Sequence, residues 1–65
     1  METNEKLIKI VTRMNRAIND FFRIYPSLDD DTKKFISSYY MGTMYSARCD
    51  IGDLSYRLKE REKLT

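Results

Sequence analysis

The sequence predicts an all-α protein in which two long helices form an antiparallel hairpin, completed into a helical bundle by dimerisation or by a partner. Apolar residues recur at spacings of three and four along most of the chain, which is typical of amphipathic helices. A short connector holding the only proline, Pro26, divides this pattern in two. A single domain of 65 residues buries a modest fraction of its surface and is marginally stable alone, and the one cysteine, Cys49, cannot form an internal disulfide.

The first helix is expected at about residues 4–24. Apolar residues repeat along it as a heptad, and further apolar residues lie beside that heptad. At a rotation of about 100° per residue, together they form an apolar stripe about 160° wide, which is typical of a bundle helix with more than one neighbour. Ile8 lies off this stripe and is expected to be exposed. Pro26 ends the helix because it keeps the preceding residue out of the helical region. The heptad residues are Leu7, Val11, Met14, Ile18, Phe21 and Tyr25.

The second helix is expected at about residues 28–62, with a C-terminal end that frays. Ser27 and an acid three residues later, Asp30, fit the pattern of a helix start. Gly52 leaves two alternatives open. The helix is kinked or broken there, or it continues, because the heptad keeps its phase across this residue. The heptad residues are Tyr40, Met44, Ala47, Ile51, Leu54 and Leu58.

The stretch 35–49 holds more apolar and aromatic side chains than one neighbouring helix could cover. A line of small residues, Ser38, Gly42 and Ser46, runs between its aromatic residues and would let another backbone approach closely. Tyrosine, methionine and arginine are enriched in protein interfaces. The same side chains could instead form the core of a homodimeric four-helix bundle. The expected partner-binding residues are Phe35, Tyr39, Met41, Gly42, Tyr45, Arg48 and Tyr56.

A basic line on the polar side of the first helix predicts an alternative site, for nucleic acid. Lys9, Arg16 and Arg23 are spaced by seven residues and lie on one side of a helix, with Arg13 beside them. Such a line could follow a phosphate backbone. Asp20 interrupts it, and an ordinary solvated helix face would have the same pattern.

The composition argues against catalysis and against a metal or cofactor site. The chain has no histidine, which is the usual general base near neutral pH and a common zinc ligand. No apolar run approaches the length of a membrane span, and the first residues lack the features of a signal peptide. We therefore expect a non-enzymatic protein of the cytoplasm, that of the host cell if the chain comes from a mobile element, without cofactor, metal or membrane.

These observations favour a small regulator, an inhibitor or adaptor, that binds another protein through an aromatic and methionine-rich helical face. A dimeric nucleic-acid-binding regulator that uses the basic line is the alternative, and a structural subunit of a larger assembly is a third possibility. The sequence does not name the protein partner.

Overall fold

The computed structural model describes residues 2–64, with the backbone alone for residue 64. The prediction of an all-α protein is confirmed, because the described residues form helices and no strand. In chain order, the helices are α1 (Glu2–Ile24), a 3-10 turn η1 (Tyr25–Ser27), α2 (Asp30–Tyr39) and α3 (Met41–Leu64).

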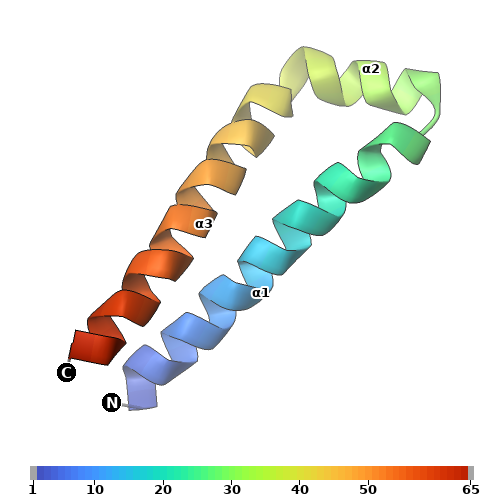
Figure 1. Cartoon of the computed structure of the whole chain (residues 1–65). Coiled ribbons are helices and arrows are strands. Elements are labelled where there is room, and N and C mark those ends of the chain that lie inside the picture. Colours follow the sequence, from blue (N-terminus) through green and yellow to red (C-terminus); the bar gives the residue numbers. More distant parts are fainter. Residues whose placement is uncertain (1, 65) are drawn as a thin grey trace.

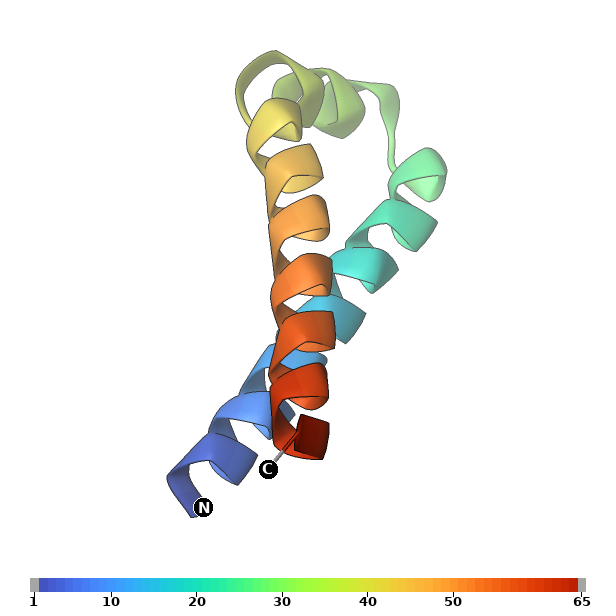
Figure 2. The same ribbon diagram turned by 60° about the vertical axis from the view of Figure 1, so that its left-hand side comes forward.

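Helices α1 and α3 run in opposite directions and pack against each other, while α2 crosses the end of the molecule away from the termini (Figure 1). Figure 2 shows that α1 and α3 cross at an angle and separate toward α2. The molecule measures 48 × 16 × 15 Å and has a radius of gyration of 14.8 Å. A compact chain of this length would have a radius of gyration of about 11 Å, so the structure is elongated. In the part of the chain that is described, no helix combines the length and apolarity needed to cross a membrane.

The expected second helix is two helices, but at Gly52 the structure has the continuous helix, one of the two alternatives that the sequence leaves open. Helix α3 passes through Gly52 without interruption, and the chain changes direction at Tyr40, where φ is −127°. Hydrogen bonds still span this residue: the Tyr40 N–H donates to the Ile36 carbonyl at 2.8 Å, and the Met44 N–H donates to the Tyr40 carbonyl at 3.0 Å. The bend therefore turns the helix without leaving the Tyr40 backbone groups unpaired.

Local sequence explains why the bend falls at Tyr40. Residues 37–40 are two serines and two tyrosines, all weaker helix formers than alanine or leucine. Gly52 lies inside α3 and faces α1, where the packing would still admit a small side chain. A Cβ atom added to Gly52 would lie 3.6 Å from the Asn15 Oδ1 of α1, which is ordinary contact.

Two rows of mainly apolar residues run along α1, and one row is shifted from the other by one residue. The seam row, which is buried or half-buried, consists of Ile8, Val11, Asn15, Ile18 and Phe22. The outer row, which is exposed except at Phe21, consists of Leu7, Ile10, Met14, Ala17, Phe21 and Ile24. Each outer-row residue directly precedes a seam-row residue, except Ile24, which precedes the half-buried Tyr25. The two rows therefore lie about 100° apart around the helix. The expectation that Ile8 is exposed is wrong, because Ile8 is half-buried in the seam row.

The core between α1 and α3 is very small. Val11, which is 3% exposed, is the only buried apolar residue among those described, and Ser55 of α3 is the buried polar one. The small side chains of Gly52 and Ser55 allow α3 to approach α1 closely. Fully buried aromatic or leucine side chains are absent from the described residues, so this contact alone supplies little hydrophobic stabilisation.

Asp29 caps α2, and this cap predicts a local dependence on pH. Its Oδ1 accepts a hydrogen bond from the Thr32 N–H at 2.7 Å. That backbone hydrogen bond, followed by one from the Thr32 side chain, lowers the pKa of Asp29 below 3.8. Because the folded-state pKa is the lower one, the cap stabilises α2 above the unfolded-state pKa and its contribution is lost as pH falls through the folded-state pKa.

As pH falls through the folded-state pKa of Asp29, the amides in the first turn of α2 are therefore expected to lose protection against hydrogen exchange, measured by NMR as each exchange rate relative to the intrinsic rate at the same pH. Asp29→Ala should give the same loss of protection at neutral pH. Asp29→Asn is the matched control, because asparagine caps a helix and does not titrate. If the asparagine variant showed the same acid dependence at Thr32, the carboxylate cap would not be its cause.

Candidate functional site

Three aromatic rings gather at the bend between α2 and α3, and we call Phe35, Tyr39 and Tyr40 the elbow cluster. The Phe35 ring centroid lies 5.6 Å from that of Tyr39 and 5.5 Å from that of Tyr40, and the two tyrosine rings are 6.3 Å apart. The three residues remain 54%, 72% and 48% exposed, respectively. The rings thus support one another while leaving much of their surface in solvent, as the aromatic anchors of a protein interface do.

Tyr45 and Arg48, two other residues of the expected partner-binding set, contact α1. The ring centroids of Tyr45 and Phe22 are 5.0 Å apart, and the Arg48 guanidinium carbon lies 5.0 Å from the centroid of the same phenylalanine ring. Phe22 also makes an edge-to-face contact with Phe21, at 5.1 Å. These contacts give Tyr45 and Arg48 a structural role in joining α3 to α1, in addition to the surface that they expose.

The remaining residues of the expected set are not brought together. Met41 is half-buried at the start of α3, and Gly42 next to it is exposed, with no heavy atom within 4 Å of an added Cβ. Tyr56, which is 64% exposed, lies farther along α3. The bend at Tyr40 also interrupts the line of small residues, because Ser38 belongs to α2 and Gly42 to α3. The structure therefore does not form one continuous groove from these residues.

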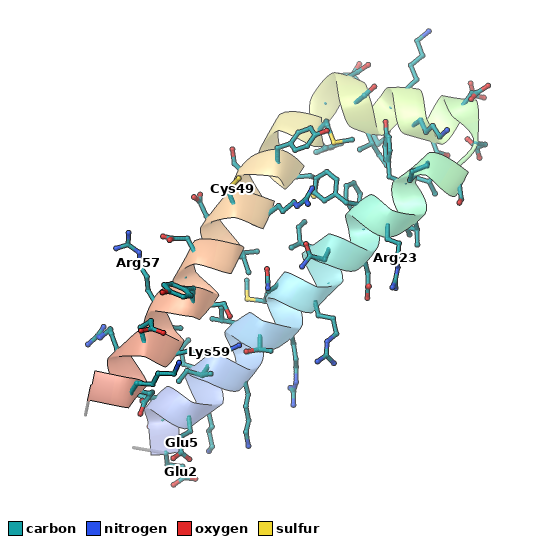
Figure 3. The ribbon with its side chains drawn as sticks, in the orientation of Figure 1. Glu2, Glu5, Arg23, Cys49, Arg57 and Lys59 are labelled. Atoms are coloured by element: carbon teal, nitrogen blue, oxygen red, sulfur yellow. The ribbon has the colours of Figure 1, made fainter. Side chains whose placement is uncertain are left out.

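The four residues of the basic line are exposed on α1 but differ in their partners. The Arg23 Nη2 lies 2.7 Å from the Asp20 Oδ1, and Figure 3 shows Arg23 directed away from α3. Lys9, Arg13 and Arg16 make no ion pair with any described residue. Lys9 and Arg13, with Lys6 and Ile10, line a shallow hollow of about 210 Å³.

Two features of the surface were not foreseen from the sequence. Tyr40 was placed in the apolar stripe of the second helix, whereas its ring completes the elbow cluster. The exposed outer row of α1 was merged with the seam row into one wide stripe. A signal for the outer row exists in the sequence, because Leu7, Ile10 and Met14 begin a complete heptad of their own.

Among the described residues, no three acidic or cysteine side chains converge as a metal site. Cys49 is exposed on α3 without a disulfide, and Figure 3 shows it on the side away from α1. Arg57, on the same helix, forms an exposed ion pair with Asp53 at 3.1 Å. Such a pair contributes little to stability.

Comparison with protein-family models, with curated proteins and with solved structures finds no match to this chain. The function of this chain is therefore inferred from its own surfaces.

Proposed function

We propose that this chain is a small non-enzymatic regulator that binds another protein through the elbow cluster. The observation that carries the proposal is the exposure of three mutually supporting rings at a corner of the molecule. Aromatic side chains contribute large contact areas at low conformational-entropy cost, and a few such anchors supply most of the energy of a typical interface. The contacts among Phe35, Tyr39 and Tyr40 restrict the rings before binding, which reduces the cost of ordering them.

The proposed mechanism is occlusion, with the elbow cluster seated in an apolar depression of the partner. The hairpin formed by α1 and α3 acts as a rod that holds the cluster at one end (Figure 1). Arg48 steers the approach to an acidic partner surface, because the basic side chains in the last turn of α3 lie at the opposite end of the rod. Binding in this position would block or bridge the surface that the partner uses.

The basic line gives less support to the nucleic-acid alternative. Asp20 neutralises Arg23 through a close ion pair, so the continuous part of the line is reduced to Lys9, Arg13 and Arg16. Among the described residues, the exposed aromatic side chains that could stack on bases lie on α2, at the bend and on α3, and none of them belongs to α1. The surface that is richest in potential binding anchors is therefore the elbow cluster.

The test is a quantitative comparison of partners captured by the wild-type chain, by Phe35→Ala with Tyr39→Ala, and by Tyr56→Ala as the control. Tyr56 is also an exposed tyrosine, but it makes no ring contact with the cluster. We expect a defined protein to be captured by the wild type and the control and to be lost from the double variant. Titration of that purified protein should then show binding weakened at least about 100-fold, because two anchors at about 2 kcal/mol each are removed.

Circular dichroism should remain helical in the double variant, because both replaced side chains are exposed. Equal affinity of the double variant and the wild type for the purified partner would refute the proposal. Binding that weakens steeply with salt and disappears in Lys9→Glu with Arg16→Glu would favour the nucleic-acid alternative instead.

A further inference from the structure

The outer row of α1 and Leu54 of α3 lie on the same side of the helix pair. On α1, the outer-row residues Leu7 to Phe21 each directly precede a residue of the seam row. On α3, Leu54 directly precedes the buried Ser55 in the same way. In any α-helix, the side chain one residue nearer the N-terminus points about 100° away around the helix axis, always in the same sense when the helix is viewed from its own N-terminus. Because α1 and α3 run in opposite directions, these two rotations place both sets of side chains on one side of the pair.

We call this side the open face. Its α1 half, the outer row, is uncharged and exposed except at Phe21, whereas the corresponding positions of α3 hold Leu54 together with Asp50 and Arg57, which directly precede the half-buried Ile51 and Leu58. Ile10 is 51%, Met14 46% and Leu54 46% exposed. The outer row contains no charged residue over its whole length, from Leu7 to Ile24. Its three- and four-residue spacing is the pattern by which one helix packs against another, so the geometry calls for a helical occupant.

The total surface of the chain shows how much of it the structure leaves uncovered. The accessible surface is 5449 Å² for a chain of 7.8 kDa. A compact monomer of this mass would expose about 4,400 Å², so the chain exposes about 1,000 Å² more. A stable interface buries about 800 Å² on each partner. The excess is therefore the area that one such interface would remove.

We propose that the open face is occupied by a second copy of this chain, which gives a two-fold symmetric four-helix bundle. A second copy presents the same uncharged row, so packing the two outer rows against each other would bury no charged residue of either row. It would also add the core that the single chain lacks, since Val11 is the only buried apolar side chain among the described residues. The open face does not include the elbow cluster, so this inference is independent of the proposed function.

The test is the mass in solution, measured by light scattering on a sizing column over a wide range of concentrations. We expect a dimer, at twice 7.8 kDa, for the wild type. Ile10→Glu with Met14→Glu should shift the mass to that of one chain, because two charges would have to be buried in the interface. The matched control is Asn19→Glu with Cys49→Glu, which adds the same two charges at exposed positions off the open face and should remain a dimer.

Chemical unfolding keeps the test decisive if the Ile10→Glu, Met14→Glu variant fails to fold. The urea midpoint of the wild type is expected to rise with chain concentration, as it must when association is linked to folding. A wild type that is monomeric at every concentration, with a constant midpoint, would overturn the inference and leave the open face to a different protein. A dimer that persists in a folded Ile10→Glu, Met14→Glu variant would equally overturn it, by assigning the contact to another surface.

Discussion

Val11→Asp is expected to unfold the chain. Val11 is 3% exposed in the contact between α1 and α3, and no described ion pair offers a partner for a carboxylate at this position. Burying an unpaired charge costs several kcal/mol, which is similar to the whole stability of a domain this small. Circular dichroism at neutral pH should show the loss of most helical signal.

Asn19→Asp is the matched control for this substitution. It places the same carboxylate on the same helix at an exposed position, so its helical signal should equal that of the wild type. A Val11→Asp variant with the wild-type helical signal and urea midpoint would show that α1 and α3 do not pack through the seam row.

Phe22→Ala is expected to have the second-largest effect on stability. The Phe22 ring contacts Phe21, Tyr45 and the guanidinium of Arg48, so its removal breaks three contacts at once. Replacing a fully buried phenylalanine by alanine costs about 3–5 kcal/mol. Because Phe22 is half-buried, we expect a decrease of about 2–3 kcal/mol in the free energy of unfolding, measured with urea at a fixed chain concentration.

Phe35→Ala provides the comparison, because it removes the same ring from an exposed site that does not touch α1. Phe35→Ala should lower the free energy of unfolding by less than about 1 kcal/mol. A double-mutant cycle between Phe22→Ala and Arg48→Ala should give a coupling energy of about 0.5–1 kcal/mol for the cation–π contact. Equal costs for the two phenylalanine variants would contradict the central position of Phe22.

Apolar spacing predicted the helical class correctly, but it merged the two rows of α1. The expected heptad took Leu7, Met14 and Phe21 from the outer row, and it took Val11 and Ile18 from the seam row. Because the rows differ by one residue, a heptad drawn between them fits the sequence as well as either row does. Only the position of α3 shows which row is covered, and that position depends on contacts between distant residues, such as Phe22 and Tyr45.

The bend at Tyr40 was missed for a similar reason. Proline and glycine are the strongest local signals for a helix end, and the nearest candidates were Pro26 and Gly52. The bend involves neither of them and coincides with the ring contacts among Phe35, Tyr39 and Tyr40. The candidate surface was thus predictable as a collection of aromatic residues, but its division into the elbow cluster and the Phe22 contacts was not.

The scarcity of buried side chains has a consequence for the shape of the unfolding transition. The heat-capacity change and the denaturant dependence of unfolding both scale with the surface that unfolding exposes. The folded chain exposes 5449 Å², more than a compact monomer of its mass, so its unfolding exposes less new surface than the unfolding of such a monomer. Its stability is therefore expected to vary less with temperature, and the single chain is expected to melt over a broader interval. Any contact that covers the open face or the elbow cluster sharpens that transition, so cooperativity itself reports whether these surfaces are covered.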